Sequence, residues 1–116
     1  MNAMRSTRAR VSADLANEVD SYFFVGLGGD VSRGGVFIAT WREIPIGERV
    51  AIEVTLDDGP LRIEGTVRWT RAPSAHAWPG LGVAFDDLSR EDRERVEAFC
   101  DAHAPVFFEL DDAAND

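Results

Sequence analysis

The sequence predicts an all-β domain with one helix: a six-stranded antiparallel β-barrel followed by a C-terminal α-helix. Three observations support this class. Several short segments place apolar residues at every second position, which is typical of strands with one buried face. Clusters of glycine, proline and aspartate separate these segments, as turns do. From Ser89 onward the apolar spacing changes to that of a helix, and Pro105 ends it.

Three strands are expected in the first forty residues. Val11, Ala13 and Leu15 alternate with polar neighbours and indicate the first strand. The aromatic and β-branched cluster at residues 22–25 predicts the second strand, which runs into a glycine-rich stretch. The compact apolar run 36–40 has the length of a strand and follows two glycines, so it predicts the third.

A long hairpin is predicted after residue 47. Apolar side chains fall on one face of the run 48–56 and again on one face of the run 61–69, and the Asp-Asp-Gly-Pro segment between them supplies turn chemistry. Trp69 is in phase with the apolar residues of the second arm, so we expect it in the core. Residues 81–85 alternate as the last strand, which two glycines interrupt.

The helix is expected to begin at Ser89, whose hydroxyl caps the first turn while Asp92 reaches back in the manner of a capping box. Four residues then share one stripe at helical spacing: Val96, Phe99, Cys100 and His103. An open sheet of so few short strands cannot bury both of its faces, so we expect the sheet to close into a barrel that the helix plugs or flanks.

The chain divides into three parts. Residues 1–10 form a basic arm whose three arginines give it a charge of +3, and we expect this arm to be flexible. Residues 11–108 form the barrel domain, with its helix at about 89–103. Residues 109–116 form an acidic tail. At 116 residues, a second folding unit is not expected.

Composition excludes several classes of protein. The chain has 45% hydrophobic residues, which favours a packed core over disorder. Twelve arginines and no lysine stand against 21 acidic residues, and the net charge of −9 argues against non-specific nucleic-acid binding. No apolar run approaches the roughly 18 residues of a membrane span, and no secretory signal is visible. The single cysteine excludes an internal disulfide, so we expect a cytoplasmic protein.

No constellation of catalytic or metal-ligating residues stands out in the sequence. Cys100 and His103 share the apolar stripe of the helix, where a buried inert thiol and a helix-end imidazole are the commoner roles. His76 has no second ligand near it in sequence. We therefore expect no enzyme activity, no bound metal and no cofactor.

The most distinctive segment is Asp30-Val31-Ser32-Arg33-Gly34-Gly35, between two predicted strands. Asp30 can accept two hydrogen bonds from the edge of a guanine, Ser32 can bridge base or phosphate, and glycine permits close approach of a backbone. A plain Asx or serine turn capped by glycines explains the same residues. Arg8 and Arg10 lie upstream, and guanidinium groups bind phosphate oxygens or the O6 and N7 atoms of guanine. A solvated tail is the alternative for this arm.

With these motifs the chain resembles the PilZ domain family, the receptor modules for the bacterial second messenger cyclic di-GMP. The family signature is Arg-x-x-x-Arg on a flexible segment, followed further along the chain by Asp/Asn-x-Ser-x-x-Gly on a β-barrel. Asp30, Ser32 and Gly35 match the second motif. Three runs are similar to a subgroup that is abundant in myxobacteria and their relatives: 34–40, 65–69 and 79–85. The resemblance covers nearly the whole chain.

The resemblance implies a PilZ-type barrel with a C-terminal helix, acting as a non-enzymatic regulatory module. It also implies that cyclic di-GMP is bound by Arg8, Arg10, Asp30, Ser32 and Gly35. The first motif departs from the family pattern, because Ser6 stands where the first arginine is expected when Arg10 is taken as the second. Serine lacks the planar cation that grips phosphate or guanine through two parallel hydrogen bonds. Family members with a degenerate arginine motif commonly act through protein partners instead, so both functions stay open.

Proteins of a motility, polarity or signalling system are the expected partners in either case. Trp41 and Trp78 lie near strand ends and are candidates for an exposed protein contact. Phe107 and Phe108 follow the helix. They either fold back onto the barrel or form an apolar patch that favours dimerisation or partner docking.

Overall fold

The computed structural model describes residues 9–14, 21–26 and 31–103, and for Ala9, Arg10 and Asp14 it describes the backbone alone. The elements in chain order are β1 (Ala9–Asp14), β2 (Tyr22–Phe24), the 3-10 helix η3 (Val31–Arg33), β3 (Gly35–Ala39), β4 (Arg49–Leu56), β5 (Gly59–Arg71), β6 (Gly80–Phe85) and α1 (Arg90–Ala102). Seven of the residues singled out above lie outside the described ranges: Ser6, Arg8, Leu15, Asp30, Pro105, Phe107 and Phe108.

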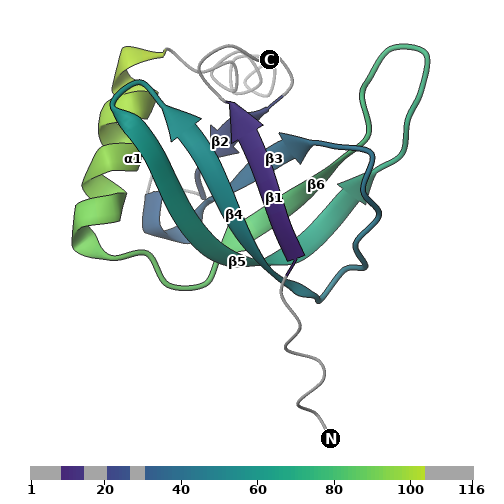
Figure 1. The fold of residues 1–116 in the computed structure, drawn as a ribbon, viewed down its shortest axis with the longest axis horizontal. Helices are drawn as coiled ribbons and strands as arrows, with labels where there is room; N and C mark the ends of the chain where they lie inside the picture. Colours follow the sequence, from purple (N-terminus) through teal and green to yellow (C-terminus); the bar gives the residue numbers. More distant parts are fainter. Residues whose placement is uncertain (1–8, 15–20, 27–30, 104–116) are drawn as a thin grey trace, which may run out of the picture.

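The six strands form one mixed sheet in the order β1-β4-β5-β6-β3-β2 (Figure 1). The pairs that follow β4 in this order are all antiparallel, as predicted. β1 pairs parallel to β4, with Ala9 opposite Val50 and Asp14 opposite Thr55, so the prediction of a purely antiparallel sheet is wrong at this edge. A parallel pair needs a long connection between its strands, and here the intervening chain forms β2, η3 and β3 before it returns.

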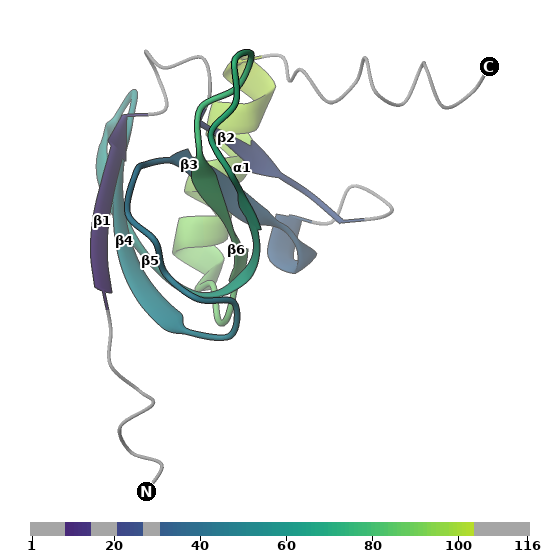
Figure 2. The same cartoon turned by 90° about the vertical axis from the view of Figure 1, so that its right-hand side faces the viewer.

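The sheet is strongly curled, which confirms the predicted barrel-like class with one C-terminal helix (Figure 2). β1 and β2 end the strand order, and no pairing joins them within the described residues, so this sheet is a half-barrel rather than a closed ring. Every strand, η3 and α1 contribute buried apolar side chains to one core. Its members include Val11, Phe23, Val31, Val36, Ile38, Val50, Ile52, Leu61, Ile63, Val67, Leu81, Val83 and Val96.

The predicted hairpin is present as β4 and β5. Its pairs run from Arg49 opposite Thr66 to Leu56 opposite Gly59. The turn uses Gly59 at a φ of +128°, a conformation that side chains with a Cβ rarely adopt. Alternate residues of β4 from Val50 onward are buried, as the sequence pattern indicated.

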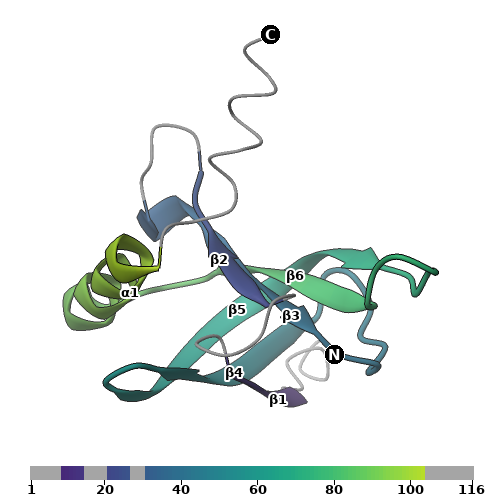
Figure 3. The same ribbon diagram turned by 90° about the horizontal axis from the view of Figure 1, so that it is seen from above.

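α1 lies between the tip of the β4–β5 hairpin and η3, as the view from above shows (Figure 3). The predicted cap is present, because the backbone N–H of Asp92 donates to the Ser89 hydroxyl oxygen at 3.0 Å. Of the predicted stripe, Val96 is buried, and Phe99 packs edge-on against Phe23 with ring centroids 5.8 Å apart. The helix therefore covers one side of the core.

Polar contacts from the middle of α1 and from the residue after it fix the helix to the β4–β5 turn. Arg95 donates to both carboxylate oxygens of Asp58, at 2.9 and 3.3 Å. His103, the last residue of the predicted stripe, is exposed; its Nε2 atom lies 2.5 Å from a carboxylate oxygen of Asp57, and its ring stacks on Phe99. The helix thus ends beside this turn.

A β-bulge in β5 reverses the side on which its last residues project. Val67 pairs with Val83 on the core side, but the next paired residue is Trp69, which stands opposite Gly82. The extra residue, Arg68, shifts the alternation by one position, and such a shift moves every following side chain to the other face. Trp69 therefore lies on the outer face of the sheet, 37% exposed, and the prediction that it belongs to the core is wrong.

Candidate functional site

Within the Asp-x-Ser-x-x-Gly segment, Val31–Arg33 form the short 3-10 helix η3, which leads into β3. The backbone N–H of Gly34 donates to the carbonyl oxygen of Val31 at 3.0 Å and closes the turn. Val31 is buried in the core, whereas Ser32 beside it is exposed. Asp30 lies outside the described residues. An apolar anchor therefore holds the turn while the Ser32 hydroxyl stays at the surface.

Two glycines allow this turn to lie against the neighbouring strands. A Cβ atom on Gly35 would stand 2.1 Å from the carbonyl oxygen of Val83 and 2.6 Å from the ring of Phe24. A Cβ atom on Gly34 would stand 2.0 Å from the carbonyl oxygen of Phe24. These distances lie far inside van der Waals contact, and the nearest blocking atoms belong to the backbone. Gly35, which the motif assigns to ligand binding, thus also has a packing role.

Aromatic side chains continue from the turn across the outer side of the sheet. Tyr22 stacks on Phe37 with ring centroids 5.3 Å apart, and Phe37 stacks on Trp69 at 5.4 Å with the ring planes 11° from parallel. Phe24, whose ring approaches Gly35, lies 6.1 Å from Trp69. The name outer aromatic face is used below for Tyr22, Phe24, Phe37 and Trp69.

Glycines in β6 make room for the outer aromatic face. A Cβ atom on Gly82 would stand 2.1 Å from the indole of Trp69, and one on Gly80 would stand 2.2 Å from the ring of Phe37. Phe37 is fully buried, while Tyr22 and Trp69 are 36% and 37% exposed. The face therefore offers two partly open aromatic side chains, in the row of strand partners two residues beyond Gly35.

This arrangement suits a planar, polar ligand. Aromatic side chains stack on the flat faces of nucleobases, and each such contact contributes about 1–3 kcal/mol. The neighbouring turn adds the Ser32 hydroxyl, and Asp30 comes directly before this turn in the sequence, outside the described residues. Sequence alternation does not identify Trp69 as a candidate site residue, because it carries no sign of the bulge. The two glycines of β6 were the available signal, since a glycine opposite an aromatic residue leaves a place for its ring.

One row of strand partners connects the start of β1 with the Asp-x-Ser-x-x-Gly turn. The row passes through residues that are paired or hydrogen-bonded in succession: Ala9, Val50, Gly65, Phe85 and Gly34. It crosses four strand spacings of about 4.8 Å, so its two ends are about 19 Å apart along the sheet.

Arg8 and Arg10, the two arginines predicted to bind the ligand, flank Ala9 in the sequence, and Ala9 is the end of this row that lies away from the turn. The backbone of Arg10 is part of β1, whereas its side chain and the whole of Arg8 lie outside the described residues. Consecutive Cα atoms are about 3.8 Å apart, so Arg8 begins next to Ala9. While β1 stays paired with β4, the arm therefore starts four strand spacings from the turn, about 19 Å as followed along the curled sheet. Because the side chains of Arg8, Arg10 and Asp30 lie outside the described residues, their joint role in ligand binding stays a prediction.

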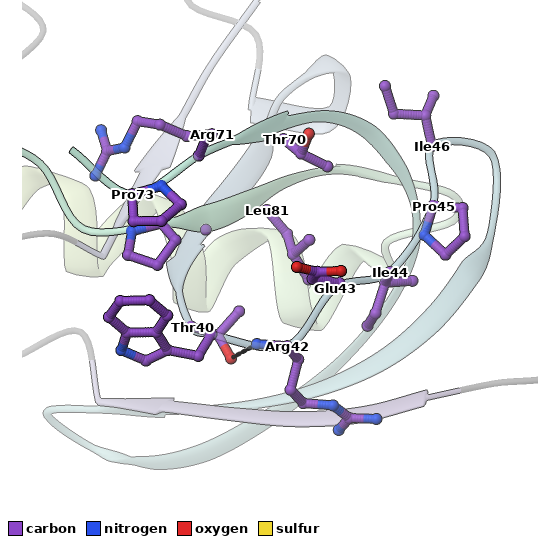
Figure 4. Close-up of a pocket in the computed structure, with 14 residues that line it drawn as sticks. Thr40, Arg42, Glu43, Ile44, Pro45, Ile46, Thr70, Arg71, Pro73 and Leu81 are labelled. Carbon is purple, nitrogen blue, oxygen red and sulfur yellow. Dashed lines mark hydrogen bonds between the residues drawn. The ribbon is translucent and has the colours of Figure 1, made fainter.

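Trp41 and Trp78 form a separate aromatic pair at the opposite end of β3 and β6. They are 65% and 54% exposed, and their rings meet edge to face with centroids 6.1 Å apart. A cavity of about 590 Å³ lies between the segment after β3 and the end of β5, with Trp41 in its wall (Figure 4). Both tryptophans line a second cavity of about 300 Å³. The name aromatic corner is used below for residues 40–46 and 70–81 around these cavities.

The described residues hold neither a cluster of metal ligands nor a long apolar helix. No group of three or more His, Cys, Asp or Glu side chains among them is placed to bind a metal ion. Within the same residues, no helix is long and apolar enough to cross a membrane. Cys100 is partly buried on α1, and this burial raises the pKa of its thiol to about 11. At neutral pH the thiol is therefore protonated and weakly nucleophilic.

Comparison with known proteins adds one match. The family model of the PilZ domain matches residues 2–102, a range that includes residues 2–10 of the basic arm, the Asp-x-Ser-x-x-Gly segment and all of α1. No curated protein matches the chain.

Proposed function

The chain belongs to the PilZ domain family, and we propose that it is a non-enzymatic regulatory module that binds cyclic di-GMP. The ligand site is the Asp30-x-Ser32-x-x-Gly35 turn together with the outer aromatic face, closed by the arginines of the basic arm. One observation carries this proposal: the turn and the face are continuous, because the ring of Phe24 approaches both Gly35 and Trp69. A base-stacking surface therefore adjoins the hydrogen-bonding turn.

Each group has its own task in this site. Trp69 and Tyr22 supply stacking surfaces for guanine. The Asp30 carboxylate accepts hydrogen bonds from the guanine N–H groups, and the Ser32 hydroxyl bonds to base or phosphate. The chain carries a net charge of −9, which repels an anionic ligand in general. The arginines of the arm offset this repulsion through charge-assisted hydrogen bonds to the phosphates.

Ligand binding requires the arm to reach the turn. Its first described residue lies about 19 Å along the sheet from the turn while β1 is paired. The arm therefore closes on the ligand either by folding back across the sheet or by the release of β1, which pairs with β4 alone among the described strands. Either movement changes the surface that a partner protein meets. Binding of the nucleotide is thereby coupled to binding of a partner from a bacterial signalling or motility system.

The aromatic corner favours a second function, that of an adaptor that works without the nucleotide. Trp41 and Trp78 are the most exposed aromatic side chains of the described residues, and neither belongs to the proposed ligand site. Ser6 replaces an arginine of the first motif, and the loss of one two-pronged contact costs about 1–3 kcal/mol, or roughly one to two decades of affinity. In this function the arm is a solvated tail and the corner alone contacts the partner.

Isothermal titration calorimetry with cyclic di-GMP tests the proposal. We expect saturable binding with a Kd tighter than about 1 mM, which corresponds to about −4 kcal/mol. Asp30→Ala should weaken the binding at least about tenfold because a charged acceptor is lost. Trp41→Ala, at the other end of β3, is the matched control and should leave the isotherm unchanged. The absence of binding at millimolar nucleotide contradicts the proposal and leaves the adaptor function.

A gain-of-function variant tests the role of the arm. Ser6→Arg completes the first motif, so it should tighten binding by roughly one to two decades. An unchanged isotherm for this variant, next to measurable binding by the unmodified chain, would show that the arm does not take part in the site.

A further inference from the structure

We propose that the aromatic corner is a self-association site that receives residues 105–110 of a second copy of the chain. The proposal goes beyond the nucleotide function and does not depend on it. The cavities of the corner are lined by residues 40–46 and 70–81, which include neither the Asp-x-Ser-x-x-Gly turn nor any member of the outer aromatic face. The two regions are neighbours, because the Arg71 guanidinium lies 4.4 Å from the centroid of the Phe37 ring, but their exposed side chains differ, so substitutions at those side chains test the two sites separately.

The corner has a backbone that is already held in place. The Thr40 N–H donates to the Pro79 carbonyl oxygen at 3.0 Å, and the Arg71 Nε–H donates to the Trp78 carbonyl oxygen at 2.7 Å. These bonds tie the segment after β3 and the end of β5 to the β5–β6 loop. Aromatic residues on a fixed backbone lose little conformational freedom on binding, so Trp41 and Trp78 are suited to be binding hot spots.

Exposed apolar surface is concentrated in the corner. Three of the large apolar side chains that are exposed in the described residues belong to it: Trp41, Ile46 and Trp78. The cavity of about 590 Å³ falls within the usual size of pockets that enclose sizeable apolar groups. In Figure 4, Ile46 and Pro45 lie on one side of the cavity and Pro73 on the other. An apolar side chain is the group that such a cavity stabilises best.

Charge selects the kind of segment that fits. The charged residues lining the larger cavity are Arg42, Arg71 and Glu43, so this wall is net positive in a chain of net charge −9. An apolar segment that is followed by carboxylates complements it. Residues 105–112 of this chain read Pro-Val-Phe-Phe-Glu-Leu-Asp-Asp. They offer two adjacent aromatic rings to the cavity and carboxylates to the arginines.

Chain length favours a segment from a second copy. α1 ends beside the β4–β5 turn, where His103 meets Asp57, whereas the corner lies at the other end of β5. From the β4–β5 turn to the corner, β5 runs for about 40 Å along its bent course, at about 3.3 Å per residue. Figure 1 shows α1 and the β5–β6 loop on opposite sides of the sheet. Phe107 follows His103 by four residues and extends at most about 14 Å from it. The segment therefore serves a neighbouring molecule rather than its own.

Two copies can exchange these segments reciprocally, because each copy carries one corner and one segment. Reciprocal exchange closes a two-fold dimer, in which the same contact occurs twice. The second contact then forms within an existing complex, which strengthens the dimer beyond one segment alone.

Light scattering coupled to size-exclusion chromatography tests the proposal on the full chain. The unmodified protein should pass from monomer to dimer as its concentration rises from micromolar to millimolar. Trp41→Ala and Phe107→Asp should each weaken the dimer roughly thirtyfold or more, as expected for a hot-spot residue. Tyr22→Ala removes a partly exposed aromatic side chain outside the corner and should leave the dimer unchanged.

A mixture of the two weakened variants separates the proposal from a general loss of folding. Trp41→Ala keeps an intact segment, and Phe107→Asp keeps an intact corner, so the mixture should form a heterodimer while each variant alone stays monomeric. Three results would overturn the proposal. The first is a full chain that stays monomeric at millimolar concentration. The second is a dimer that persists in both variants. The third is a monomeric protein whose tryptophan fluorescence changes with Phe107→Asp, which would place the segment on the corner of its own chain.

Discussion

The outer aromatic face and the aromatic corner hold the same kinds of side chain in different settings. Trp69 lies over Gly82 within the sheet and stacks nearly parallel on Phe37, so strand pairing fixes the orientation of its ring. Trp41 and Trp78 come from segments outside the strands and meet edge to face, with more than half of each exposed. A ring that is held flat in a sheet is a surface for another planar group. A ring that projects from a loop is a contact for an apolar side chain.

The largest difference between the two regions is expected for glycine substitutions. Gly35→Ala places a Cβ atom 2.1 Å from a backbone oxygen of β6, so β3 and β6 must separate. We expect the free energy of unfolding to fall by about 3 kcal/mol or more, measured by chemical denaturation. Gly47→Ala, next to the corner, is the matched control.

Gly47 differs from Gly35 because nothing lies within 4 Å of its added Cβ, although its φ is +99°. Its substitution should cost only the backbone strain, about 1–2 kcal/mol. Equal losses for the two variants would contradict the claim that close packing of strands, rather than conformation, requires Gly35.

The two kinds of tryptophan should respond differently to truncation. Trp69→Ala removes ring contacts with Phe24 and Phe37, and we expect a loss of about 2–3 kcal/mol, less than for a fully buried tryptophan. Trp41→Ala should change the free energy of unfolding by no more than about 0.5 kcal/mol. Both are measured by denaturation at low protein concentration. Comparable losses would show that the corner is part of the folded core instead of a surface.

The smallest expected effect concerns the anchor of α1, the helix that packs against η3 beside the outer aromatic face. The hydrogen bonds from Arg95 lower the pKa of Asp58 below its usual value of 3.8. A lowered pKa stabilises the folded state above that usual value, and this contribution is lost as the pH falls through the lowered pKa. Asp58→Asn should therefore reduce the Tm slightly at pH 6, and the gap should close under strongly acidic conditions. A gap that is independent of pH would exclude this linkage.

The sequence predicts those elements whose pattern depends on one buried face or one cap. Alternation places the hairpin correctly, since the predicted runs 48–56 and 61–69 lie within or closely match β4 and β5. Ser89 caps α1 as expected. Alternation identifies which face of a strand is buried, but it contains no information about the partner strand or its direction. The parallel pairing of β1 with β4 could not be predicted for that reason.

The candidate site is predictable where a local motif defines it. Ser32 lies in the turn that the motif indicates and Gly35 begins the strand that follows, and their role in ligand binding stays a prediction. The side of the sheet on which Trp69 lies depends on the extra residue Arg68 in β5. A strict two-residue alternation cannot predict such an inserted residue. Trp41 and Trp78 are exposed near strand ends, as expected from their places in the sequence. Their contact with a partner also stays a prediction.

One titration tests the central claim that the nucleotide binds on the outer aromatic face and not at the corner. The chain has three tryptophans, so its ¹H–¹⁵N NMR spectrum contains three indole N–H signals. Addition of cyclic di-GMP should shift the signal of Trp69, together with the backbone amides of Ser32 and Gly35, and leave those of Trp41 and Trp78 in place. Shifts confined to Trp41 and Trp78, or none at millimolar nucleotide, would contradict the account.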